Sequence, residues 1–82
     1  MQVRLLFFAA ARDAAGRSQD VVELPAEVTN VAQFTAWLGR QYPPLDPYLV
    51  CLRIAQNEKF VNGAATLHSG DTLAVIPPVA GG

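Results

Sequence analysis

Only one stretch of this 82-residue chain carries a convincing helical pattern, and segments typical of β-strands lie on both sides of it. Residues 30–42 carry their apolar side chains at the spacing of a single helix face: Val31, Phe34, Leu38 and Tyr42. Asn30 precedes this stripe as an N-cap, and Gln33 completes a capping-box pattern three residues later. The chain therefore has one amphipathic helix with which to cover one face of a sheet.

The strands are predicted from their density of β-branched and aromatic residues. They are expected over residues 2–8, 18–24, 49–57, 59–61 and 72–76. The first two form an antiparallel pair, joined by a helical turn or loop that ends at Gly16 in a left-handed conformation. The order β-β-α-β-β-β predicts an α+β roll of the β-grasp type, a mixed sheet covered on one face by one main helix. A ferredoxin-like alternative needs a second helix. We expect a β-grasp domain over residues 1–76 and an extended tail over residues 77–82.

Composition excludes several classes of function. The net charge is −1 and the six basic residues are scattered, which argues against a nucleic-acid surface or a polybasic membrane anchor. The apolar run over residues 5–11 is far too short to span a bilayer, and it only faintly imitates a secretion signal. A single cysteine, Cys51, excludes an internal disulfide and a thiol-based metal cluster, so we expect no metal site and a cytoplasmic location. Its apolar neighbours predict a buried thiol, while Trp37 is expected in the core and His68 on the surface.

The face of the sheet that should be polar carries apolar residues. Alternation in the first strand places Val3, Leu5 and Phe7 on one side, and Arg4, Leu6 and Phe8 on the other. Ile76 falls on the Arg4 side in the last strand, and Phe60 in the short fourth strand is a further candidate. Either a loop covers these residues or the faces are misassigned, or else they form an exposed patch that binds a partner.

The last strand runs into a tail whose residues become progressively slimmer: Pro77, Pro78, Val79, Ala80, Gly81 and Gly82. The prolines end the strand and favour a stiff, extended exit. The glycines have no side chains, so such a tail fits a channel too narrow for other sequences and presents a carboxylate at its tip. Once activated as an acyl-adenylate, that carboxylate is able to form an isopeptide bond or accept sulfur as a thiocarboxylate.

Over its full length the chain resembles the small sulfur-carrier subunit of molybdopterin synthase. The resemblance rests on "LLFFAAARDAAG" (residues 5–16), on "SGDTLAVIPPVAGG" (residues 69–82) and on the turn at Asn57. It implies a ubiquitin-like β-grasp fold. It also implies a role as the sulfur-donor subunit of a sulfurtransferase, without an independent catalytic site in this chain.

The resemblance further implies a reaction cycle and a set of partners. An adenylyltransferase of the ubiquitin-activating type would adenylate Gly82 with ATP and Mg²⁺, neither of which this chain would bind. A sulfurtransferase would then supply sulfur, and the Gly82 thiocarboxylate would donate it to a cyclic pterin precursor (precursor Z) in molybdenum cofactor biosynthesis. The large catalytic subunit would receive the tail, with two carriers in a heterotetramer. By position, Phe8, Arg12, Phe60 and Ile76 would contact these partners.

Three alternatives remain open at the level of sequence. The thiazole-synthesis sulfur carrier shares the fold, the terminal glycines and the chemistry. A ubiquitin-like modifier would instead use Gly82 to form isopeptide bonds with target lysines. In a plain interaction module the tail would be inert. A free-standing enzyme is disfavoured, because the sequence lacks a convincing nucleophile, base or metal constellation.

Overall fold

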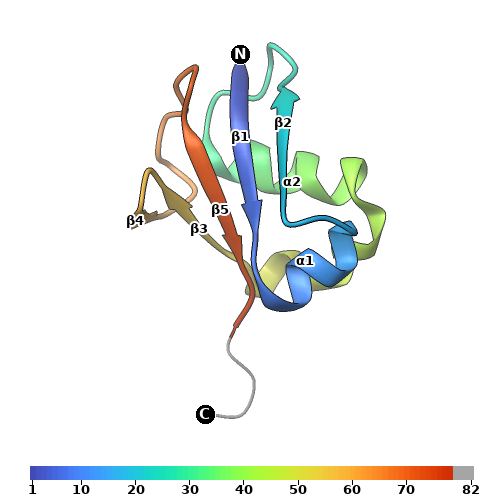
Figure 1. Cartoon of the computed structure of the whole chain (residues 1–82). Helices are drawn as coiled ribbons and strands as arrows, with labels where there is room; N and C mark the ends of the chain where they lie inside the picture. The colour runs from blue at the N-terminus through green and yellow to red at the C-terminus, as the bar shows by residue number, and fades with distance from the viewer. Residues whose placement is uncertain (79–82) are drawn as a thin grey trace.

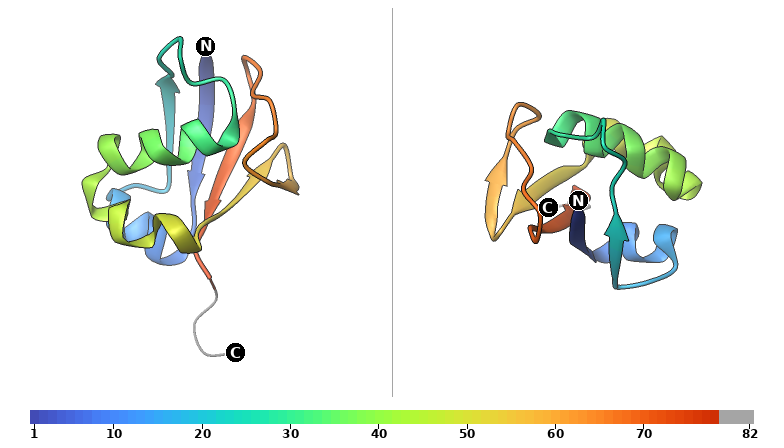
Figure 2. Two further views of the ribbon diagram at one scale, coloured as in Figure 1. Left: turned by 180° about the vertical axis from the view of Figure 1, so that it is seen from behind. Right: turned by 90° about the horizontal axis from the view of Figure 1, so that it is seen from above.

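The structure is a computed structural model that describes residues 1–78 (Figure 1). Its elements follow the chain as β1 (Gln2–Phe7), α1 (Ala9–Ala15), β2 (Gln19–Glu23), α2 (Val31–Gln41), the 3₁₀ helix η1 (Pro43–Cys51), β3 (Arg53–Gln56), β4 (Lys59–Val61) and β5 (Thr72–Ile76). The α2 helix crosses one face of the sheet, while α1 and η1 lie at the end of the sheet where β5 finishes (Figure 1, Figure 2).

The five strands form one mixed sheet in the order β2-β1-β5-β3-β4. The first and last strands, β1 and β5, pair in parallel, whereas the other neighbours are antiparallel. The predicted α+β roll with a mixed sheet is therefore confirmed, including the antiparallel pair made by the first two strands. Because β5 lies between β1 and β3, the chain leaves the sheet from its middle strand.

The core lies between α2 and the sheet. Alternation in β1 is as predicted, since Val3, Leu5 and Phe7 are buried. From α2, the predicted stripe residues Val31, Phe34, Leu38 and Tyr42 are all buried. Trp37 is also buried and stacks on Phe34 with ring centroids 6.0 Å apart, so its predicted core position is confirmed.

The start of α2 is fixed by the capping box that the sequence predicted. The Asn30 side-chain oxygen accepts a hydrogen bond from the Gln33 N–H at 2.8 Å, and the Gln33 side-chain oxygen accepts from the Asn30 N–H at 3.2 Å. These reciprocal bonds satisfy backbone donors that the first turn of a helix leaves without partners.

Tyr42 fixes the other end of this helix to the sheet. Its ring meets Phe7 edge-on, and its hydroxyl donates a hydrogen bond to the Asp20 carboxylate at 2.8 Å. Burial, followed by this bond to Asp20, raises the pKa of Tyr42 well above its ordinary value. The same hydrogen bond is the main cause that lowers the pKa of Asp20. The Arg17 guanidinium donates a hydrogen bond to this carboxylate at 2.8 Å and lowers the pKa further.

The predicted third strand was too long. Residues 49–51 belong to η1, and β3 begins only at Arg53. Prolines at the start of η1 and at Pro47 within it hold φ close to a helical value, and the turns that they begin continue through Cys51. Leu49 lies against the bare backbone of Gly39, where an added Cβ would stand 2.6 Å from its Cδ1. The interpretation of Cys51 as a buried thiol was also wrong, because this residue ends η1 and is exposed.

The segment after β1 is more regular than the expected turn or loop. It forms the seven-residue helix α1, which begins after Phe8 and ends at Gly16 with φ of 75°. The predicted left-handed glycine is therefore confirmed. His68 is exposed, also as predicted.

Candidate functional site

The face of the sheet opposite α2 carries a row of apolar side chains. The strand register places Leu6 beside Ala74, Ala74 beside Ala55, and Ala55 beside Phe60. Directly paired residues point to the same side of a sheet, so the row crosses β1, β5, β3 and β4. Leu6 and Ala74 are half-buried, Ala55 is buried, and Phe60 is 55% exposed.

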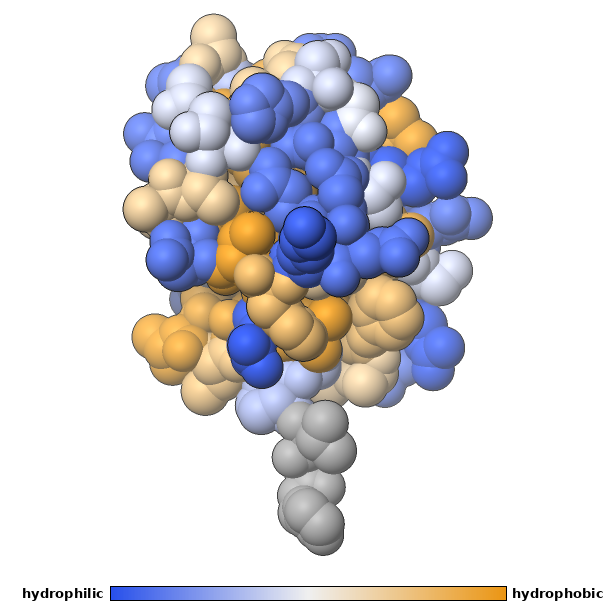
Figure 3. Space-filling view, turned by 90° about the vertical axis from the view of Figure 1, so that its left-hand side faces the viewer, coloured by the Kyte–Doolittle hydropathy of each residue, from blue (hydrophilic) through white to orange (hydrophobic). Residues whose placement is uncertain are grey.

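Two further apolar residues extend the row toward the end of β5. Phe8 is 47% exposed, and its N–H donates to the Val75 carbonyl at 3.2 Å, which holds it beside β5. Ile76 is half-buried and pairs with Arg53 of β3. We call the set formed by Leu6, Phe8, Phe60, Ala74 and Ile76 the apolar patch. Seen from the β4 side, apolar side chains gather near the end of β5, and hydrophilic ones cover the region above (Figure 3).

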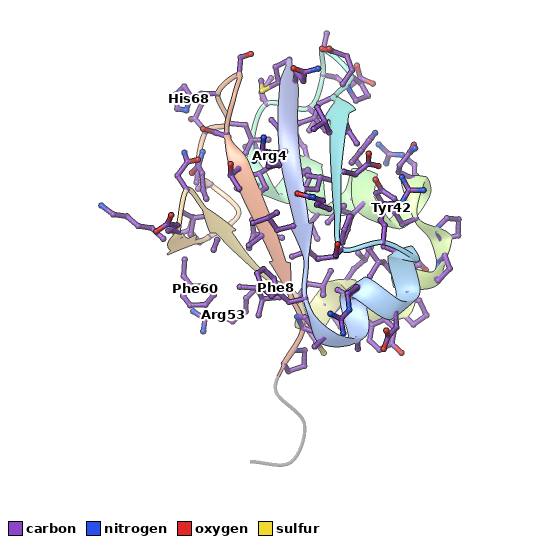
Figure 4. The ribbon with its side chains drawn as sticks, in the orientation of Figure 1. Arg4, Phe8, Tyr42, Arg53, Phe60 and His68 are labelled. Carbon is purple, nitrogen blue, oxygen red and sulfur yellow. The ribbon has the colours of Figure 1, made fainter. Side chains whose placement is uncertain are left out.

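Arg53 introduces a positive charge beside this patch. Its guanidinium carbon lies 3.9 Å from the centroid of the Phe60 ring, a close cation–π contact. Phe8, Arg53 and Phe60 lie near one another at the end of the sheet where β5 finishes, whereas Arg4 lies nearer the start of β1 (Figure 4). Together with Val61, Asn62 and Ala65, Arg53 and Phe60 line a shallow hollow next to β4.

Arg53 is not among the site residues predicted from the sequence, because no face is assigned to the predicted strand over residues 49–57. The signal was present, since Arg53 directly precedes the apolar Ile54 and alternation places the two on opposite faces. What the sequence did not give was the partner strand that carries Phe60.

Arg12, predicted to contact a partner, is exposed on α1. Its N–H donates to the Phe8 carbonyl at 3.3 Å, so it lies one helical turn beyond a residue of the patch. The structure thus places Arg12, Leu6, Phe8, Phe60 and Ile76 on accessible or half-buried surface at the same end of the sheet. Their roles in binding stay predictions.

The ladder of β5 ends at Ile76, directly before the two prolines, as the sequence predicted. Pro77 is buried and Pro78 is exposed. The remaining tail residues, which include the predicted reacting residue, lie outside the described residues: Val79, Ala80, Gly81 and Gly82.

A buried carboxylate fixes the β3–β4 hairpin to the start of β5. Asp71 is only 6% exposed and accepts hydrogen bonds from the side chains of Gln56 and Asn57 at 2.7 and 2.9 Å, and from the His68 N–H at 2.8 Å. Asn57 has φ of 51° in the two-residue turn, and its side-chain oxygen accepts from the Thr72 N–H at 2.9 Å. Burial raises the pKa of Asp71, but these hydrogen bonds outweigh it and hold the pKa below its ordinary value.

The Asp71 network positions the hairpin that carries Phe60, yet Asp71 is not among the site residues predicted from the sequence. An aspartate beside a glycine turn carries no sign of partners 14 and 15 residues away.

Metal sites and membrane-spanning helices are two further features to consider. In residues 1–78, no three or more His, Cys, Asp or Glu side chains are grouped to hold a metal ion. Nor does any helix of that range have the length and apolarity to cross a membrane.

Fold and surface together define a ubiquitin-like β-grasp protein with an apolar patch at the base of its C-terminal tail. The sequence profile of the ThiS family matches residues 5–82, and the chain belongs to this family. It is similar to the molybdopterin synthase sulfur carrier subunit of Chlamydomonas reinhardtii, with 31% identity over all of both chains. The subunit of the same name from Drosophila yakuba is 33% identical and matches all of this chain and 92% of its own length. The resemblance found in the sequence is thereby confirmed.

Solved structures show the same fold. A Pyrococcus furiosus protein, provisionally assigned as subunit 1 of molybdopterin converting factor, has a TM-score of 0.82 and 26% identity over 96% of this chain and 99% of its own. SAMP1 of Haloferax volcanii has a TM-score of 0.80 at 24% identity, over all of both chains. Subunits 1 and 2 of the molybdopterin-converting factor of Helicobacter pylori were solved as a complex. One chain of that structure matches with a TM-score of 0.70 and 24% identity over all of both chains.

Proposed function

We propose that this chain is the sulfur carrier subunit of a molybdopterin synthase. The observation that carries the proposal is its similarity, over the whole of both chains, to a relative of that name. The terminal Gly81-Gly82, placed after β5 and two prolines, supplies the slim carboxylate that the chemistry requires. The large catalytic subunit, the adenylyltransferase and the sulfurtransferase are the proposed partners, and the cytoplasm the proposed location.

The proposed chemistry takes place on the Gly82 carboxylate. The carboxylate attacks the α-phosphate of ATP on the adenylyltransferase, with Mg²⁺, and pyrophosphate leaves. Sulfur that the sulfurtransferase delivers at the oxidation level of sulfide (HS⁻) then attacks the acyl carbon and displaces AMP, which leaves a thiocarboxylate. The thiocarboxylate donates its sulfur to a cyclic pterin precursor held by the large subunit, and water restores the Gly82 carboxylate. No described side chain of this protein has to act as acid, base or nucleophile in these steps.

The described residues would act by binding and orientation. The apolar patch lies on one face of the sheet and reaches the end of β5, so a partner that covers the patch would also receive the residues that follow Ile76. Pro77 and Pro78 restrict the direction of the exit, which lowers the entropy lost when the tail enters a pocket. Docking and delivery of the reacting group are thus coupled through one strand.

The test is the intact mass of the protein isolated from its own host, with fragmentation to locate any change. We expect one oxygen of the Gly82 carboxylate to be replaced by sulfur, and a variant lacking Gly82 to carry no such replacement. Fragmentation is needed because oxidation of Met1 or Cys51 adds nearly the same mass. A plain carboxylate at Gly82 in cells with ample sulfur would contradict the proposal, and isopeptide conjugates on lysines would instead support a protein modifier.

A further inference from the structure

We infer that Arg53 determines partner specificity by pairing with a carboxylate that the large subunit presents to the apolar patch. This inference rests on the proposed function and adds to it the chemistry of the partner's surface. The relevant charges lie on the outer face of the sheet, which is the face opposite α2.

The outer face is cationic although the chain has a net charge of −1. The strand register places three charged side chains on this face: Arg4, Glu23 and Arg53. Glu23 is paired with the N-terminal ammonium group at 2.9 Å. Within residues 1–78, neither Arg4 nor Arg53 forms an ion pair. A surface with two unpaired guanidinium groups is complementary to an acidic partner.

Position distinguishes Arg53 from Arg4. Arg53 pairs across the ladder with Ile76, the last residue before the prolines, whereas Arg4 pairs with Thr72 at the far end of β5. A group that binds Arg53 therefore lies next to the point where the tail leaves the sheet. Contact at Arg53 would fix the register between the partner's pocket and the tail.

The Phe60 ring prepares Arg53 for this contact. With the ring 3.9 Å from the guanidinium carbon, one side of the group is covered by carbon and its N–H groups stay available. A stacked guanidinium is restricted in motion, so less conformational entropy is lost when it binds a carboxylate through two parallel hydrogen bonds. Binding of the partner over the patch would also exclude water and strengthen the pair between the guanidinium and the carboxylate.

The experiment measures binding of the purified full chain to the large synthase subunit of the same organism, by calorimetry between roughly 0.05 and 0.5 M salt. We expect Arg53→Gln to weaken the dissociation constant about tenfold or more at low salt and to reduce its salt dependence. Arg53→Lys keeps the charge but loses the planar group, so an intermediate loss is expected. The matched control is Arg40→Gln, which removes the same charge from an exposed residue of α2 on the other layer.

Phe60→Ala separates the charge from the apolar contact. We expect it to weaken binding while leaving the salt dependence closer to that of the wild type than Arg53→Gln does. Equal effects of Arg53→Gln and Arg40→Gln would overturn the inference, as would weaker binding by Arg53→Gln with an unchanged salt dependence. Either result would leave the sulfur-carrier function standing if Gly82 carries sulfur. Failure of the wild-type chain to bind the large subunit would overturn the inference at once, and the mass at Gly82 would then decide the proposed function separately.

Discussion

At the scale of the residue, Asp71 helps to position the apolar patch without belonging to it. It is buried and receives three hydrogen bonds from the β3–β4 hairpin region and the turn before β5. Buried charges are tolerated in proteins when hydrogen bonds replace the lost water, and here the donors supply that replacement. The hairpin that carries Phe60 therefore depends on the ionised form of Asp71.

We expect acid to destabilise the fold through this residue. The pKa of Asp71 is lower in the folded chain than its ordinary value of 3.8, so the unfolded chain binds the proton more readily. The contribution of Asp71 to stability is fully present above about pH 5 and is lost as the pH falls through the folded-state pKa. Urea unfolding at pH 7 and pH 3 should show this loss in the wild type.

Asp71→Asn should remove much of that acid sensitivity and cost about 2 kcal/mol of unfolding free energy at pH 7, because an amide offers only one acceptor oxygen to several donors. The matched control is Asp13→Asn on the exposed surface of α1, which should change neither quantity appreciably. A variant at Asp71 that kept the full acid sensitivity of the wild type would place its origin elsewhere.

At the scale of the element, α2 begins where its reciprocal capping bonds place it. Asn30→Ala removes the acceptor for the Gln33 N–H, and we expect a loss of about 1 kcal/mol in the unfolding free energy measured with urea. Asn30→Asp retains an acceptor and should remain close to the wild type. Gln41→Ala, at the exposed far end of the helix, is the control. Equal stability of Asn30→Ala and Gln41→Ala would show that packing alone fixes the start of the helix.

Elements with local signals could be predicted from the sequence, whereas those fixed by distant contacts could not. The capping box and the apolar stripe of α2 lie within the helix itself, so the sequence contains them in full. The η1 helix depends on Leu49 reaching the bare backbone of Gly39, a contact between separate elements. The apolar residues at the end of η1 resemble those of a strand. The exposed position of Cys51 follows from the same tertiary arrangement.

The candidate site, too, could be predicted from the sequence only in part. Alternation along a single strand was enough to place Leu6 and Phe8 on the outer face. Alternation with Ile54 also indicates the outer face for Arg53. Its contact with Phe60 could not be predicted, because that contact joins two neighbouring strands. The charge of the whole face depends on which strands pair, because Arg4, Glu23 and Arg53 come from three different strands.

At the scale of the whole molecule, stability and the proposed reaction belong to separate parts of the chain. The buried residues of the hydrophobic core all lie between Val3 and Val75 in the sequence. Deletion of Gly81 and Gly82 should therefore change the unfolding free energy by less than about 0.5 kcal/mol, while it abolishes sulfur loading. Leu73→Ala, in contrast, should cost about 2 to 5 kcal/mol, because it leaves a cavity in the core. Urea unfolding and intact mass measure the two effects, and a large loss of stability on deletion would contradict the separation.

The parallel pairing of β1 with β5 also decides how the molecule responds to mechanical force. The N-terminus lies at one end of the sheet, and β5 finishes at the other (Figure 1). Tension between the N-terminus and the residues after Ile76 thus acts along both strands, across the direction of the hydrogen bonds that join them. Such a load shears the ladder as a unit instead of opening it one bond at a time. If a partner holds the tail of the proposed carrier, a pull against the N-terminus therefore loads the whole β1–β5 ladder at once.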